Sequence, residues 1–150
     1  MYKRIVRARL RDTFDRINEG DYMTMVDGLA DSFEYRFHGQ HALGGRRTSR
    51  ASMLLWWQRV FRLLPGMHFA VQDVLVNGGP RRTRVAVRSL VSGALPGGQR
   101  YENTVFQFLT IAWGKVESVE TIEDLRVLEH ALRAVAESGN PEALADPIED

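Results

Sequence analysis

The sequence predicts an α+β domain in which helices come first and an antiparallel β-sheet follows. Up to Leu64 the apolar residues recur mainly at helical spacing, and from Phe69 onward β-branched residues alternate with polar ones between glycine-rich turns. The chain has 150 residues and no internal repeat or linker, which suits one domain that buries a core or encloses a cavity. We therefore expect a single domain over residues 1–137 and a flexible acidic tail over residues 138–150.

Two helices are expected before the first strand. Residues 3–19 carry an apolar stripe at helical spacing, and arginines occupy the opposite face. We interpret that face as a solvated surface, with a basic binding arm as the alternative. Asp21 caps a second helix that reaches about Ala30, and residues 33–37 then alternate apolar and polar side chains like a short strand.

A loop over residues 38–47 is rich in glycine and histidine and leads into a third helix. Residues 44–47 would suit an anion at the helix amino terminus, but a mobile lid over a pocket is the simpler interpretation. Thr48 or Ser49 caps this helix, which carries two tryptophans and ends at Pro65-Gly66.

Four strands of an antiparallel meander are expected in the second half of the chain. They comprise residues 68–77, residues 82–92, residues 99–112 and a last arm that follows a tight turn at Trp113-Gly114-Lys115. Asp124 then caps a final helix that has a leucine and valine stripe.

Composition narrows the class of protein. The net charge is +1, so there is no electrostatic reason to expect nucleic acid or a membrane surface as a partner. The chain has no cysteine, which excludes a disulfide framework and a thiolate nucleophile. Its basic amino terminus lacks the apolar block of a signal peptide, and no later run is long enough to span a bilayer. We expect a cytoplasmic protein.

Polar groups recur on an otherwise apolar face of the strand over residues 99–112. Tyr101, Asn103 and Gln107 share one face with Val105 and Leu109, because strand side chains alternate with a period of two. An apolar surface that keeps a few hydrogen-bonding groups is typical of the wall of a small-molecule pocket.

Several short motifs, taken in order, resemble one family. They are Gly20-Asp21, Phe37-His38-Gly39, Leu43-Gly44-Gly45, Tyr101-Glu102-Asn103, Trp113-Gly114-Lys115-Val116 and Glu123-Asp124. With this order and spacing the chain resembles the nuclear transport factor 2-like superfamily, and within it the SnoaL-like group, which includes polyketide cyclases and relatives of ketosteroid isomerase. The resemblance covers residues 3 to about 130. It implies a cystatin-like cone, with a curved sheet around the amino-terminal helices, a pocket inside, a C-terminal helix and a dimer through the outer sheet face.

The chain departs from the catalytic sets of two relatives. Ketosteroid isomerase relatives use a carboxylate, a tyrosine and a protonated acid, whereas this chain has Phe14 where a phenol is needed and offers His38 and His41 in place of an aspartate. Epoxide hydrolases of the superfamily use an Arg-x-Asp pair, but the similar pair here, Arg100 and Glu102, lies on the strand face opposite Tyr101.

Three residues are candidates for proton transfer. His41 would serve as the base, because the unperturbed pKa of histidine is about 6.5, and loop hydrogen bonding is the alternative role. Glu120 shares a strand face with Ser118 and Ile122, and an inward carboxylate there would have a raised pKa, whereas an outward ion pair is the alternative. Asn103 would orient the substrate.

Seven further side chains are expected to bind the ligand. They are Phe14, Trp56, Trp57, Phe61, Arg88, Tyr101 and Gln107. Most would supply an apolar wall, and the arginine would be an internal cation unless it points outward to solvent or to a dimer partner. The histidines lack the spacing of a metal site, and no phosphate-binding loop is present, so neither a metal nor a cofactor is expected.

Two functions therefore remain open. The first is a cofactor-independent enzyme that acts on a small apolar substrate by proton transfer, as an isomerase, a cyclase, a dehydratase or an epoxide-opening enzyme. The second is a non-catalytic protein that binds a hydrophobic ligand or forms a dimeric scaffold. Phe106 and Phe108 lie on the face opposite Tyr101, which favours a homodimer through that face, unless a one-residue bulge turns the phenylalanines inward.

Overall fold

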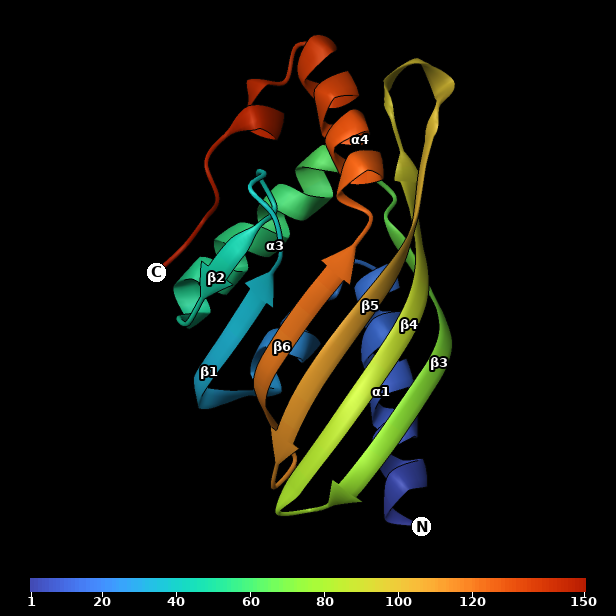
Figure 1. The fold of residues 1–150 in the computed structure, drawn as a ribbon, viewed down its shortest axis with the longest axis vertical. Helices are drawn as coiled ribbons and strands as arrows, with labels where there is room; N and C mark the ends of the chain where they lie inside the picture. Colours follow the sequence, from blue (N-terminus) through green and yellow to red (C-terminus); the bar gives the residue numbers. More distant parts are fainter.

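Six strands form one curved sheet in a computed structural model that describes residues 1–150. Across the sheet the strand order is β2-β1-β6-β5-β4-β3 (Figure 1). The strands are β1 (Leu29–Phe37), β2 (Gly45–Arg47), β3 (His68–Gly79), β4 (Arg82–Ala94), β5 (Arg100–Ala112) and β6 (Lys115–Glu123). All neighbours are antiparallel except β1 and β6, which run parallel. The predicted meander corresponds to β3 through β6.

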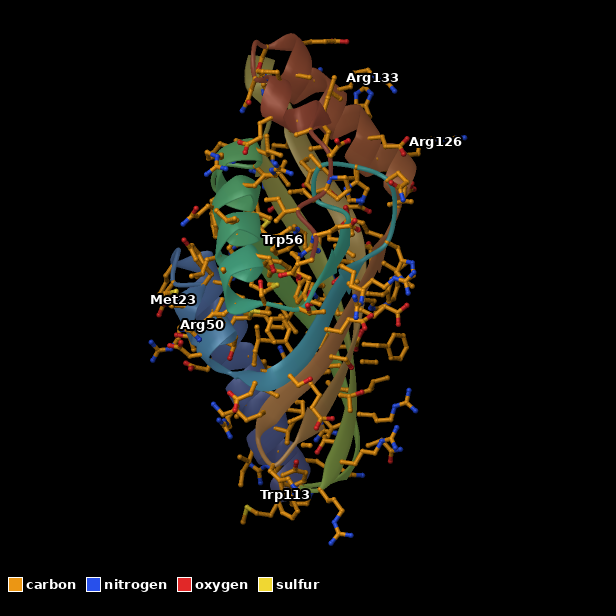
Figure 2. All side chains as sticks on the ribbon, turned by 90° about the vertical axis from the view of Figure 1, so that its left-hand side faces the viewer. Met23, Arg50, Trp56, Trp113, Arg126 and Arg133 are labelled. Atoms are coloured by element: carbon orange, nitrogen blue, oxygen red, sulfur yellow. The ribbon has the colours of Figure 1, made fainter.

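The helices cover the concave face and one end of this sheet (Figures 1 and 2). They are α1 (Tyr2–Asn18), α2 (Met23–Asp27), α3 (Arg50–Leu63) and α4 (Leu125–Glu137). The long helix α1 packs against β3, and α4 packs against β5 at the end of the sheet. The buried apolar side chains form one core between the helices and the sheet. The predicted α+β cone is thereby confirmed. None of the helices is both long and apolar enough to cross a membrane.

Local sequence signals fix several element ends. The Ser49 side chain accepts a hydrogen bond from the Ser52 amide and begins α3, and the Asp124 side chain accepts from two amides at the start of α4. Trp113 and Gly114 join β5 to β6 with φ angles of 51° and 80°. Two successive positive φ angles are what a two-residue hairpin turn requires, and Gly114 adopts such an angle at little cost.

Two expected boundaries differ from the structure. The second helix ends at Asp27, not near Ala30, and β1 already begins at Leu29. Leu29 lies opposite Val116 of β6, so pairing with a distant strand overrides the local helical pattern. The expected loop over residues 38–47 also ends in a strand, β2, which pairs with β1.

The carboxyl-terminal segment, residues 138–150, has a defined place, whereas the sequence predicts a flexible tail. It contains a short 3-10 turn over Pro141–Leu144, buries Ala143 and then descends beside α3 and β2 (Figure 1). Glu142 forms ion pairs with Arg59 and Arg62 of α3. These contacts join residues about eighty positions apart in the chain, so a local composition pattern does not reveal them.

Candidate active site

The inner face of β5 supplies the polar groups of the interior. Burial alternates strictly along this strand, and Tyr101, Asn103 and Gln107 are buried together with Val105 and Leu109. The face chosen from the sequence as the pocket wall is therefore the concave face of the sheet.

Two adjoining chambers lie between this face and the helices. Chamber one, of about 40 Å³, is bounded by side chains of β1, β5, β6 and α3, among them Tyr101 and Glu123. Chamber two, of about 80 Å³, lies toward α1, and the chambers share the side chains of Tyr35, Phe69 and Gln107. A buried water molecule needs about 10–15 Å³ of such cavity volume, so the chambers hold a few water-sized molecules. A ligand that contains a ring fits only if the side chains that line the chambers move apart.

A hydrogen-bonded group of three side chains lies at the end of chamber one. The Tyr101 hydroxyl donates to Glu123 Oε1 at 2.5 Å. Asn103 Nδ2 donates to the Tyr101 oxygen at 3.0 Å and to the backbone carbonyl of Asp124 at 2.9 Å. Asn103 therefore holds the phenol of Tyr101 in one orientation, and the phenol in turn orients the carboxyl group of Glu123. Nearby, Gln107 Nε2 donates to Thr121 Oγ1 at 3.1 Å.

Burial changes the acidity of this group. Desolvation raises the pKa of Glu123 to about 7, the hydrogen bond from Tyr101 opposes that rise, and the neighbouring Asp124 charge adds to it. Burial and the adjacent Glu123 carboxylate raise the pKa of the Tyr101 hydroxyl. Near neutral pH Glu123 therefore exists in both protonation states, which is the property required of a group that takes up and returns a proton.

The sequence predicts an inward carboxylate on β6 at Glu120, but the structure has it three positions later, at Glu123. Glu120 faces the outer side of the sheet, where its Oε1 lies 2.5 Å from His38 Nε2, and its side chain is about half exposed. The physical reason is a bulge: Thr110 pairs with Ser118 but Ile111 pairs with Val116, so Glu117 has no partner. One extra residue reverses the faces of the following positions.

Glu123 thus takes the inward position that Glu120 was expected to hold. Thr121 and Glu123 point inward after the bulge, and Ile122 points outward. The sequence analysis did not single out Glu123; the one signal that could have done so is its place in the Glu123-Asp124 motif, which is part of the family resemblance.

His41 is buried, but both ring nitrogens are engaged by the loop backbone. Its Nδ1 accepts from the Leu43 amide at 3.2 Å, and Nε2 lies 2.9 Å from the His38 carbonyl oxygen, to which it donates. Burial lowers the pKa of the imidazole. The ring packs edge-on against Phe37 and does not line either chamber. The structure therefore holds His41 apart from Asn103 and Glu123.

The expected aromatic wall is distributed over both chambers. Trp56 lines chamber one, donates from Nε1 to the Leu43 carbonyl at 2.9 Å and lies between α3 and the sheet (Figure 2). Phe14 and Trp57 line chamber two, and the buried Nε1 of Trp57 has no hydrogen-bond partner. Phe61 packs against Trp57 and lines neither chamber.

Arg88 does not supply an internal cation. It lies on the outer face of β4, where it forms an ion pair with Asp73 of β3, and its side chain is about half exposed. The alternation of β4 is the reason, because the buried neighbours Val87 and Ser89 take the inward positions.

The buried cation of the interior is Arg47 instead. Its side chain is completely inaccessible, and its guanidinium carbon lies 5.6 Å from the ring centroid of Tyr35 and 5.1 Å from that of Trp56. Nothing in the sequence distinguishes Arg47 from the exposed Arg46 beside it. No three histidine or acidic side chains gather in a position to share a metal ion.

The fold defines a class: the protein has the nuclear transport factor 2-like architecture. Its structure is similar to that of IdmH from Streptomyces antibioticus, a proposed polyketide cyclase, with a TM-score of 0.68, 22% identity, and coverage of 84% of this chain and 96% of that chain. It is also similar to TerC co-crystallised with polyporic acid, with a TM-score of 0.70, 18% identity, and coverage of 86% and 96%. A nuclear transport factor 2-like protein of unknown function from Burkholderia pseudomallei gives a TM-score of 0.70 at 14% identity, with coverage of 85% and 95%.

The family is shown by the sequence itself. Residues 10–119 match the SnoaL-like domain, and the chain belongs to that family. The resemblance drawn from the motifs is confirmed. A comparison with proteins of curated function finds no match.

Proposed function

We propose that this protein is an enzyme that transfers a proton on a small, apolar, polyketide-type substrate, with Glu123 as the acid-base group. The observation that supports this most directly is the carboxyl group of Glu123 at the wall of an apolar chamber, with its pKa raised to about 7. Membership of the SnoaL-like family and the similarity to IdmH, a proposed polyketide cyclase, favour this class of substrate. Isomerisation, aldol-type cyclisation, dehydration and epoxide opening all use such a step.

The proposed step begins with ionised Glu123. The carboxylate removes a proton from a substrate C–H group that lies beside a carbonyl, and the electron pair of that bond moves toward the carbonyl oxygen. Protonated Glu123 then returns the proton at another atom or to the leaving oxygen. Tyr101 and Asn103 hold the carboxyl group in one orientation, which avoids the cost of reorienting it during the reaction. No cofactor is needed for this step.

The experiment uses 5-nitrobenzisoxazole, a flat apolar probe that opens when a base removes its ring C–H proton. The N–O bond breaks, a nitrile forms, and the oxygen leaves as a coloured phenolate. We expect the protein to accelerate this opening, with a rate that rises with pH through about 7 as Glu123 ionises. Glu123→Gln should lose about a hundredfold or more in rate. Glu117→Gln, an exposed carboxylate on the same strand, is the matched control and should retain the rate. Equal rates for the two variants would contradict the proposal.

The second candidate is a non-catalytic protein that binds a hydrophobic ligand. It is favoured by the small volume of the chambers and by the hydrogen bonds that already occupy Tyr101 and Asn103. A binding protein would take up 5-nitrobenzisoxazole without opening it. Binding followed by fluorescence quenching of the buried tryptophans, with no release of phenolate, would favour this candidate over the enzyme.

A homodimer through the outer sheet face is part of the same proposal. Phe106, Phe108 and Ile122 form an apolar patch there, and their side chains are 48%, 54% and 45% exposed. Such a patch is characteristic of an interface. Sedimentation should give a dimer for the wild type and a monomer for Phe108→Glu. Leu55→Glu, at a position 54% exposed on α3, should remain a dimer. A wild-type monomer would contradict this part of the proposal.

A further inference from the structure

The positively charged side chain of Arg47 is not in contact with any carboxylate. Its Nη1 donates to the carbonyl oxygens of Gly44 at 2.8 Å and Ile148 at 2.7 Å, and its Nη2 donates to the carbonyl oxygen of Gly45 at 3.2 Å. The buried Nε has no partner. Arg47 takes part in none of the ion pairs of the structure. Fully buried arginines are normally paired with an acid, so this arrangement needs a reason.

The acids that attract Arg47 lie in the carboxyl-terminal segment and face solvent. Glu149 accepts a hydrogen bond from the Arg46 amide, and Asp150 accepts one from the Thr48 amide. Both side chains are exposed, so water screens their charges. The field of the guanidinium toward the protein interior is therefore only weakly compensated.

Two aromatic rings separate Arg47 from chamber one. The guanidinium lies over the rings of Tyr35 and Trp56, and both side chains line the chamber, whereas Arg47 itself does not. Tyr35 is the polar member of the pair, and it lines both chambers. Burial raises the pKa of its hydroxyl to about 12, and the Arg47 charge opposes that rise. Hydrogen bonding from Thr121 and Gln107 opposes the rise as well, and the Glu123 charge adds to it. Gln107 and Thr121 also line chamber one and are bonded to each other. The phenol of Tyr35 is thus a hydrogen-bond donor supported by a buried cation.

We propose that the cavity binds the anionic form of an enol- or phenol-type ligand, whose oxygen accepts a hydrogen bond from Tyr35 and is stabilised by the charge of Arg47 behind that ring. The proposal rests on the proposed function and deepens it. When Glu123 takes the substrate proton it becomes neutral, and the electron pair of the broken C–H bond leaves a negative charge on the substrate oxygen. The charge moves from the carboxylate to an oxygen near Arg47, so the interior keeps the same total charge.

The test measures binding of 4-nitrophenol, which changes colour on ionisation, and of 4-nitroanisole, which has no proton to lose. We expect the wild type to bind nitrophenolate more tightly than the uncharged forms, which lowers the apparent pKa of the bound probe. Tyr35→Phe keeps the ring beneath the guanidinium and should reduce the preference for the anion about tenfold. Arg47→Met should also reduce it, and Arg47→Lys, which keeps the charge, should retain most of it. Binding of 4-nitroanisole should be the same in the wild type and Tyr35→Phe.

Several outcomes would overturn the inference, and they differ from those that test Glu123. The inference is refuted if the pKa of bound nitrophenol is the same as that of the free probe. It is also refuted if Tyr35→Phe prefers the anion as strongly as the wild type does, a result that can be obtained even if Arg47→Met does not fold. Glu123→Gln should keep or increase the preference for the anion while it loses ring opening of 5-nitrobenzisoxazole. If the anion preference is absent but Glu123→Gln still abolishes ring opening, the inference fails and the proposed function stands.

Discussion

Replacing Glu123 with glutamine should change how stability depends on pH. Burial holds the pKa of this carboxyl at about 7 in the folded protein, against an ordinary value of 4.5 in the unfolded chain. The unfolded state therefore releases the proton at a lower pH than the folded state does. Between these two values the folded state binds more protons, so stability falls as pH rises. Its contribution is fully present below pH 4.5 and is lost once the pH exceeds about 7.

The magnitude follows from the two pKa values. Each pH unit between them costs about 1.4 kcal/mol of unfolding free energy, so the whole interval costs about 3 kcal/mol. Glutamine has nearly the same shape and cannot ionise. The unfolding free energy of the wild type minus that of Glu123→Gln should therefore decrease by about 3 kcal/mol from pH 4.5 to pH 8. Titrations that the two proteins share cancel in this difference.

The assay is urea unfolding at a series of pH values, followed by the fluorescence of the tryptophans, two of which are buried. Glu117→Gln serves as the control, because its side chain lies on the same strand but faces solvent. A difference between the wild type and Glu123→Gln that stays constant across this range would refute the assignment of a raised pKa to Glu123. A difference that grows in the opposite direction would show that Tyr101 stabilises the ionised carboxylate more than burial destabilises it.

Three further tests by substitution probe the architecture of the protein. Asp124→Ala removes the side chain that caps α4 and should cost about 1 kcal/mol of stability, measured by thermal unfolding. Gly44→Ala would place a Cβ 2.2 Å from the Gly39 carbonyl oxygen and should cost about 2 kcal/mol or more, whereas Gly79→Ala, which meets nothing within 4 Å, should cost less than half of that. Equal losses for the two glycines would contradict the steric argument. Glu142→Gln weakens two ion pairs to α3 and should lower the unfolding free energy by at most about 1 kcal/mol. It should also speed amide hydrogen exchange in residues 138–150, and unchanged exchange would show that these pairs do not hold the segment.

Local patterns were sufficient to predict most of the fold. The alternation along β5 identified the inner face correctly, and glycine-rich turns and the caps at Ser49 and Asp124 gave the order of elements. Each of these features depends on residues that are close together in the sequence, and for that reason it could be predicted. The motif order was enough to recognise the SnoaL-like family.

The parts of the site that were missed depend on contacts between distant residues. The bulge at Glu117 arises from the pairing of β5 with β6, and it decides that Glu123, not Glu120, points inward. The burial of Arg47 depends on the carbonyl of Ile148, 101 positions later in the chain. Periodicity describes one strand at a time and contains no information about such partners.

The parallel pairing of β1 with β6 also has a consequence for how the protein folds. β3 to β6 are joined by short turns and can pair one after another. β1 is the neighbour of β6 in the sheet, but its partner lies far away in the chain, as the pair Leu29 and Val116 shows. The entropy of closing the loop between these two strands is lost before the strands gain their pairing, which slows folding. We expect the hairpins to form early and the amino-terminal third of the chain to dock late. Chamber one takes walls from both parts, so the ability to bind a ligand should be acquired only in the last kinetic phase.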